Sequence, residues 1–137
     1  MFGALNVMNE TSLENIASAW IKHAAVIQAD EDDDTFAWSW DIESDYQYDD
    51  QPEKLWKLIL EIHAQDKKQT FVELLSAGPL ENLLVDFGDK YIVNIEKQAK
   101  ADPAFAFLLG GVWKSSMNDK VWERVQNVWN RKGWDGN

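Results

Sequence analysis

Cysteine is absent from the 137-residue sequence, and histidine occurs only twice. The lack of cysteine excludes disulfide bonds, thiolate metal sites and a cysteine nucleophile. The two histidines, His23 and His63, stand 40 residues apart, so the sequence holds no local histidine motif. We therefore expect no metal and no cofactor.

Long apolar runs are absent too. No stretch approaches the roughly 18 apolar residues that a membrane-spanning helix requires. The first ten residues contain no lysine or arginine, so they do not form the basic start of a secretory signal. From these features we expect a cytoplasmic protein that makes no contact with membranes.

Basic residues are missing from one segment. Between His23 and Glu53 there is no lysine or arginine, but eleven of the 24 acidic residues lie there. The rest of the chain has 13 acidic and 13 basic residues, so this segment carries the whole net charge of −11. Such a charge argues against direct binding to nucleic acid or anionic membranes. The eleven acids are Asp30, Glu31, Asp32, Asp33, Asp34, Asp41, Glu43, Asp45, Asp49, Asp50 and Glu53.

Apolar residues make up 45% of the chain and aromatic residues 12%, which is enough for a packed core. We expect a single domain over residues 1–137, with fraying at 131–137. The acidic segment 30–53 also contains five aromatic residues, Phe36, Trp38, Trp40, Tyr46 and Tyr48. A solvated acidic linker would not contain so many.

Apolar residues recur at helical spacing along most of the chain and predict an all-α fold. The stretch from Phe36 to Ile42 also alternates as on a strand. No other segment offers a partner strand, so we prefer a helix over 36–46. About eight short helices with tight turns indicate antiparallel neighbours, and consecutive pairs also resemble a helical-repeat array. The expected helices lie near 12–28, 36–46, 52–65, 71–77, 79–88, 89–101, 103–109 and 118–130.

Short motifs mark several helix ends. Thr11-Ser12-Leu13-Glu14 fits a capping box, and Asp102-Pro103 fits an N-cap followed by a first helical residue. Gly78 is expected to end one helix in the left-handed conformation before Pro79 opens the next. Gly88 is expected to close that next helix.

The end of the chain has a turn and an amphipathic stripe. Gly110-Gly111 is expected to be a turn that folds the last helix back. Trp122 and Val125 lie on one stripe of that helix, so we expect both in the core, facing residues 105–113.

Three stretches together resemble a known family. They are Ser76-Ala77-Gly78-Pro79-Leu80-Glu81, Leu108-Leu109-Gly110-Gly111-Val112-Trp113 and Val121-Trp122-Glu123-Arg124-Val125. Their order and spacing resemble an uncharacterised family of small bacterial all-helical acidic domains. The resemblance spans about residues 12–130 and favours a helix at 36–46, but it brings no established activity.

Motifs for catalysis or metal binding are weak. Asp30, Asp32, Asp34 and Asp41 fall at positions of a calcium loop that carry carboxylates. Thr35 replaces the glycine required there, however, and Asp41 replaces the bidentate glutamate, so we do not predict a calcium site. Gly110-Gly111 is no phosphate loop, and no serine has a nucleophile-elbow context. We therefore expect a protein that is not an enzyme.

The acidic segment is the candidate binding site. Trp38 and Trp40 cannot both face inward on a helix, so at least one of them is expected either as an exposed binding hot spot beside the acids or packed under the 29–35 loop. No base lies within the segment, so we expect seven of its carboxylates to be exposed and unpaired: Asp32, Asp33, Asp34, Asp41, Asp45, Asp49 and Asp50. The predicted partner-binding residues are Asp32, Asp33, Asp34, Trp38, Trp40, Asp41, Asp45, Tyr46, Tyr48, Asp49 and Asp50.

This site suggests a small inhibitor of a basic protein. A toxin-immunity protein is the most concrete form, because nuclease toxins have cationic clefts that bind phosphates. A DNA mimic that blocks a nucleic-acid-binding protein uses the same physics. The alternative is a non-inhibitory helical adaptor or scaffold, in which the acids only provide a solvated surface.

Overall fold

The computed structural model describes residues 11–134, and these residues form helices and no strand, which confirms the all-α prediction. No helix in this range is both long and apolar enough to cross a membrane. A π-helical turn at Ser76–Leu80, here called the π turn, joins α5 to α6. The α-helices are α2 (Leu13–Gln28), α3 (Trp38–Tyr48), α4 (Pro52–Gln65), α5 (Val72–Leu75), α6 (Glu81–Ala101), α7 (Pro103–Leu109) and α8 (Asp119–Val128).

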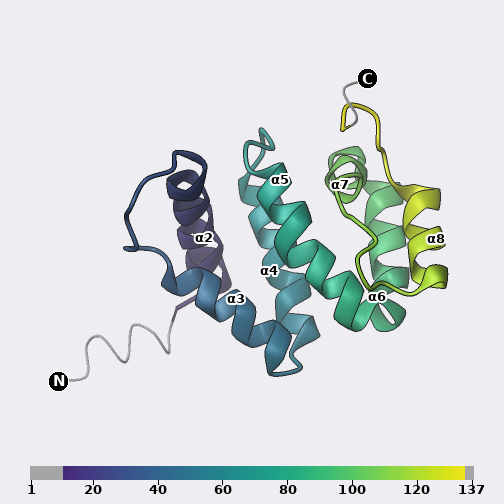
Figure 1. Ribbon diagram of the computed structural model, residues 1–137, viewed down its shortest axis with the longest axis horizontal. Helices are drawn as coiled ribbons and strands as arrows, with labels where there is room; N and C mark the ends of the chain where they lie inside the picture. Colours follow the sequence, from purple (N-terminus) through teal and green to yellow (C-terminus); the bar gives the residue numbers. More distant parts are fainter. Residues whose placement is uncertain (1–10, 135–137) are drawn as a thin grey trace.

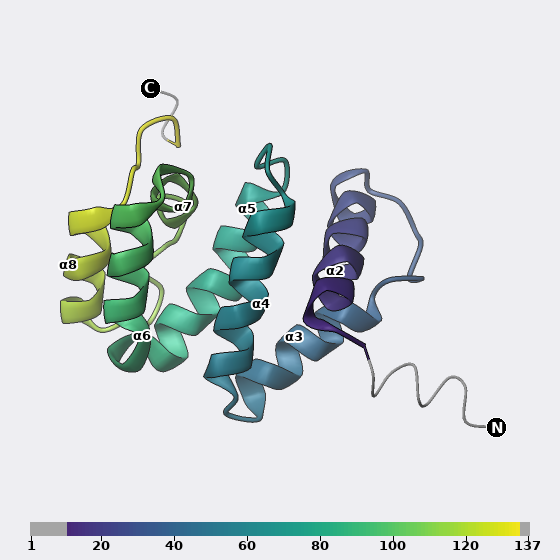
Figure 2. The same ribbon diagram turned by 180° about the vertical axis from the view of Figure 1, so that it is seen from behind.

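The helices follow one another along the long axis of the protein (Figures 1 and 2). α2 and α3 lie at one end, α7, α8 and the C-terminal part of α6 lie at the other, and α4, α5 and the first part of α6 lie between them. α2 packs on α3 and α4, whereas α6 packs on α7 and α8. One apolar cluster runs through these contacts, from Trp20 of α2 through Leu58 of α4 and Ile95 of α6 to Val125 of α8.

The predicted helices over 12–28, 36–46 and 52–65 correspond to α2, α3 and α4. The N-terminal cap of α2 differs from the prediction by one residue. Ser12, not Thr11, is the N-cap, and its hydroxyl accepts a hydrogen bond from the backbone N–H of Asn15 at 3.1 Å. Asp102 caps α7 as predicted, accepting from the backbone N–H of Ala104 at 3.0 Å.

The predicted break at Gly78-Pro79 is wrong, because the chain stays helical from Val72 to Ala101. Gly78 does not take the positive φ that a helix-ending glycine has. A proline inside a regular α-helix removes one hydrogen bond and clashes with the carbonyl four residues earlier. The wider π turn contains Pro79, and the helix continues through it instead of ending.

Gly88 does not end a helix either. The backbone leaves helical geometry one residue earlier, at Phe87 (φ −134°, ψ 20°), and α6 then continues to Ala101 as a kinked helix. Gly88 is buried against α8, where an added Cβ would lie 2.9 Å from Cγ1 of Val121. The glycine therefore allows α6 and α8 to approach closely. This merging of predicted helices explains why residues 11–134 contain fewer separate helices than expected.

Among the helices, the last one packs mainly on α6, and Val125 shares the apolar cluster with Phe105 and Val112 of the predicted region. Val125 is fully buried, as expected. Trp122 is only half-buried, and its ring packs edge-on against Trp129 with 5.2 Å between the centroids. The apolar stripe of α8 was predicted correctly, but Trp122 is less buried than the prediction required.

Residues 131–134 belong to the segment that was predicted to fray, and in the structure they contact α7 and the turn that follows it. The ring of Trp134 stacks on that of Phe107 with 5.1 Å between the centroids, and its indole N–H donates to the carbonyl of Phe107 at 2.8 Å. Arg131 donates to the carbonyl of Gly110 at 2.8 Å. This C-terminal segment, residues 129–134, lies directly on Gly110, where an added Cβ would be 2.1 Å from the carbonyl oxygen of Asn130. Residues 135–137 lie outside the described range.

Replacing Gly110 by alanine is expected to displace the C-terminal segment. The methyl group meets backbone, which cannot rotate away as a side chain can, so we expect a loss of about 1–3 kcal/mol in unfolding free energy. The indole N–H signal of Trp134 should shift in NMR spectra as its hydrogen bond to Phe107 is lost.

Gly78→Ala is the matched control, because nothing lies within 4 Å of a Cβ added there. Alanine also has the higher helix propensity, so this variant should be as stable as the wild type or slightly more stable. Equal stability of the two variants would contradict the close packing assigned to Gly110.

Candidate functional site

The acidic segment forms the outer surface at one end of the protein. Asp32, Asp33 and Asp34 lie on the connection between α2 and α3, and Asp49 and Asp50 follow α3. Asp41 and Asp45 lie one turn apart on α3 itself. All seven carboxylates are exposed, and within residues 11–134 none of them forms an ion pair. Their exposure agrees with the prediction made for them.

Asp33 has local hydrogen bonds instead of an ionic partner. Its carboxylate accepts from the hydroxyl of Thr35 at 2.6 Å and from the Thr35 backbone N–H at 2.9 Å. These bonds, the side-chain one most, lower the pKa of Asp33 below its ordinary value. The carboxylate therefore keeps its negative charge, and it also shapes the loop that enters α3.

The aromatic residues of the segment divide into two groups. Trp38, Trp40 and Tyr46 are half-buried and pack against the core, whereas Tyr48 is 79% exposed. Trp40 stacks on Trp20 of α2 with 5.2 Å between the centroids, and its indole N–H donates to the Trp20 carbonyl at 3.2 Å. Trp40 therefore attaches α3 to α2, and Tyr48 is the aromatic side chain available at the surface.

Glu43 is the residue that the sequence analysis missed. It was counted among the eleven acids of the segment but not among the predicted binding residues, and it is only 8% exposed. One carboxyl oxygen accepts from the indole N–H of Trp20 at 2.8 Å. Burial raises the pKa of Glu43 from 4.5 to about 7, and the hydrogen bond from Trp20 opposes this rise only in part. It lies four residues after Ser39, which is also buried, so both side chains are on the inner side of α3, a side that no sequence pattern had marked.

Glu43 lines a cavity of about 310 Å³ between α2, α3 and the helical run that contains the π turn. The lining combines two indole rings, one carboxyl group and small residues of the π turn. The lining residues are Trp20, Trp40, Glu43, Ser44, Leu74, Ala77, Gly78 and Pro79. The Ala77-Gly78-Pro79 stretch, read in the sequence as a simple turn, thus forms one wall of this cavity.

His23 lies beside the same aromatic pair. Its ring meets Trp40 edge-on at 4.8 Å between the centroids, and the side chain is buried. Among the described residues, Nδ1 of His23 has no hydrogen-bond partner. The ring therefore packs as an apolar surface against Trp40.

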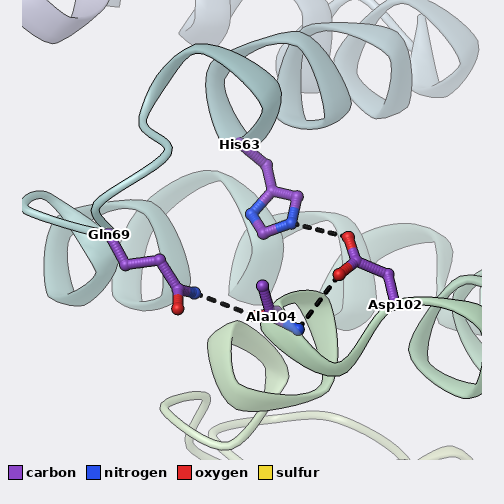
Figure 3. A network of polar contacts seen from close by, with 4 residues as sticks. All are labelled: His63, Gln69, Asp102 and Ala104. Atoms are coloured by element: carbon purple, nitrogen blue, oxygen red, sulfur yellow. Dashed lines mark hydrogen bonds and ion pairs between the residues drawn. The ribbon is translucent and has the colours of Figure 1, made fainter.

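The second histidine belongs to a structural network, shown in Figure 3. Nε2 of His63 lies 2.9 Å from a carboxylate oxygen of Asp102, and the amide of Gln69 donates to the Ala104 carbonyl at 2.9 Å. Burial alone would raise the pKa of Asp102, but the contacts with His63 and with backbone N–H groups lower it below its ordinary value. The network joins α4 and the connection after it to the start of α7.

The described residues contain no group of three or more acidic or histidine side chains that could hold a metal ion. This includes Asp30, Asp32, Asp34 and Asp41, which match parts of a calcium loop in sequence but do not converge. The structure thus brings together two features at α3: an unpaired acidic outer face and a buried carboxyl group in an aromatic cavity.

Comparison with known proteins places the chain in a family. No curated protein and no solved structure matches it. The sequence model of DUF6869, described as a family of unknown function, matches residues 27–133. This range includes α3, the π turn with Gly78, the Gly110-Gly111 turn and α8. Since the match covers well over half of the sequence, the chain belongs to the DUF6869 family.

Proposed function

We propose that the protein is a cytoplasmic binding protein that inhibits a basic partner by covering its cationic surface. A toxin-immunity protein directed at a nuclease is the most concrete form of this proposal. A DNA-mimic inhibitor of a nucleic-acid-binding protein is a variant, because a cationic surface that binds phosphates also attracts an array of carboxylates.

The observation that carries this proposal is the unpaired charge at one end of the protein. Seven exposed carboxylates lie on α3 and its flanking connections, and no lysine or arginine of residues 11–134 forms an ion pair with any of them. Like charges gathered in this way repel one another and cost folding stability. A basic partner would relieve that repulsion on binding, and the field would accelerate the encounter.

The outer face of α3 provides a suitable contact surface. Asp41, Asp45 and Tyr48 stand at positions i, i+4 and i+7, so their side chains lie along one side of the helix. Tyr48 offers a large amphipathic ring, a residue type enriched at binding hot spots. Trp38 and Trp40 are half-buried and pack against the core, and their contact with the partner stays a prediction.

The test begins with a pull-down that uses the whole chain as bait, followed by titration of the captured partner. The triple variant Asp41→Asn, Asp45→Asn and Asp49→Asn should associate with it about tenfold or more slowly than the wild type at low salt. Higher salt should reduce the difference, because exposed charges are screened beyond about 8–10 Å at physiological ionic strength. Tyr48→Ala should mainly speed dissociation.

The matched control removes three exposed carboxylates elsewhere, through Glu14→Gln, Glu73→Gln and Glu123→Gln. It has the same net charge as the triple variant but retains the acidic face. We expect nearly wild-type association from it. Equal affinities of the wild type and the triple variant at low salt would reject the electrostatic proposal and favour the adaptor function.

A further inference from the structure

We propose that the cavity between α2, α3 and the π turn binds an organic cation, an alkylammonium or guanidinium group, with Glu43 as its counterion and Trp20 and Trp40 as its aromatic wall. This site is distinct from the acidic outer face, and the inference does not rest on the function proposed above.

The size and lining of the cavity fit a small ligand. Its volume of about 310 Å³ is at the lower end of the range for ligand pockets, roughly 300–1,000 Å³, so one small molecule or one side chain fills it. Most of the lining is apolar, and Glu43 and Ser44 are its polar side chains. A largely apolar pocket with few polar groups is typical of sites that orient a ligand through one strong interaction.

Glu43 determines the charge of the ligand. More than nine-tenths of its surface is buried, and its one recorded hydrogen bond is the bond from Trp20 to Oε1. Within residues 11–134 no lysine, arginine or histidine forms an ion pair with it. A buried carboxylate is costly unless it is paired. A cation in the cavity provides that pairing, whereas an anion would be repelled.

The aromatic wall favours an organic cation over a metal ion. Indole rings attract ammonium and guanidinium groups through their electron-rich faces. The two rings are fixed, because Trp20 donates to Glu43 and Trp40 donates to the Trp20 carbonyl. Calcium requires six to eight oxygen ligands, and the lining offers one carboxyl and one hydroxyl side chain.

The experiment titrates the whole chain at pH 8, where Glu43 is ionised, with n-butylammonium and n-butylguanidinium, and follows the indole N–H signals of Trp20 and Trp40 by NMR. Butyrate and 1-butanol, at the same ionic strength, are the anionic and neutral probes. We expect saturable shifts of both signals with the cations only. Equal shifts with butyrate or 1-butanol would overturn the proposal.

Variants then test the assigned residues. Glu43→Gln keeps the shape and the acceptor for Trp20 but removes the charge, so cation affinity should fall about tenfold or more. Glu14→Gln removes one exposed charge from α2, outside the lining of the cavity, and should bind as the wild type does. Ala77→Leu narrows the cavity from the opposite wall and should also weaken binding. Wild-type affinity in Glu43→Gln would reject the site.

A further comparison identifies the source of the cation. Nα-acetyl-lysine N-methylamide presents the same ammonium group as part of a peptide. If it binds at least as tightly as n-butylammonium, the occupant is a side chain of a protein partner. If only the free amine binds, the occupant is a small molecule. Either result supports the cation site. If neither compound binds, the proposal is overturned.

Discussion

Replacing Glu43 by glutamine is expected to stabilise the protein by about 3 kcal/mol at pH 8 and by less than about 1 kcal/mol at pH 5. The folded state holds the Glu43 proton up to a pKa of about 7, whereas the ordinary value is 4.5. Each pKa unit corresponds to about 1.4 kcal/mol. Glutamine fills the same space and still accepts the hydrogen bond from Trp20, without a charge to bury.

The direction of this pH dependence follows from how many protons the folded and unfolded states bind. Between pH 4.5 and about 7 the folded wild type binds more protons at Glu43 than the unfolded chain does, so its stability falls as the pH rises. Denaturant unfolding of the wild type and Glu43→Gln at pH 5 and pH 8 measures the effect. Asp45→Asn is the control, since Asp45 is exposed. A stability difference between wild type and Glu43→Gln that is the same at both pH values would contradict the buried ionisable state.

The second large effect is expected for Phe105→Ala, which should lower the unfolding free energy by about 3–5 kcal/mol. Phe105 is fully buried, and its ring packs edge-on against Trp56 at 5.8 Å and against His63 at 5.6 Å between centroids. Removing the ring leaves a cavity where α4 meets α7, and chemical denaturation measures the loss.

Trp122→Ala is the informative comparison for Phe105→Ala. From the sequence, Trp122 was expected in the core, and its replacement by alanine would then lower the unfolding free energy by a similar amount. In the structure it is half-buried, so its loss should be clearly smaller than that of Phe105. A larger loss of unfolding free energy in Trp122→Ala than in Phe105→Ala would contradict the placement of Phe105 deeper in the core than Trp122.

Much of the fold follows from local patterns. The apolar spacing of α2 and α4 predicted their positions to within about one residue. Asp102-Pro103 predicted the start of α7, because both the cap and the fixed proline φ act within one turn. The helix at α3 followed from the lack of a partner strand. The features of α2, α4 and α7 depend on interactions between residues near in sequence, whereas the argument for α3 compared distant segments.

The errors arose where distant parts of the chain decide the outcome. Pro79 lies inside a helix because a π turn accommodates it, and Gly88 permits contact with Val121 instead of ending a helix. Neither can be read from neighbouring residues. Glu43 was indistinguishable from ten other acids, since its burial depends on how α3 lies against Trp20 of α2. The acidic face was predictable, whereas the cavity was not.

The row of helices has a consequence for folding kinetics. α2 packs on α3 and α4, and α6 on α7 and α8, so each of these helices packs on the next one or two helices along the chain. Closing short loops costs little entropy, and helical domains rich in local contacts fold in microseconds to milliseconds. α2 and α8 lie at opposite ends of the row (Figure 1). Each end can therefore open and close locally while the contact between α4 and α6 holds the middle of the protein together.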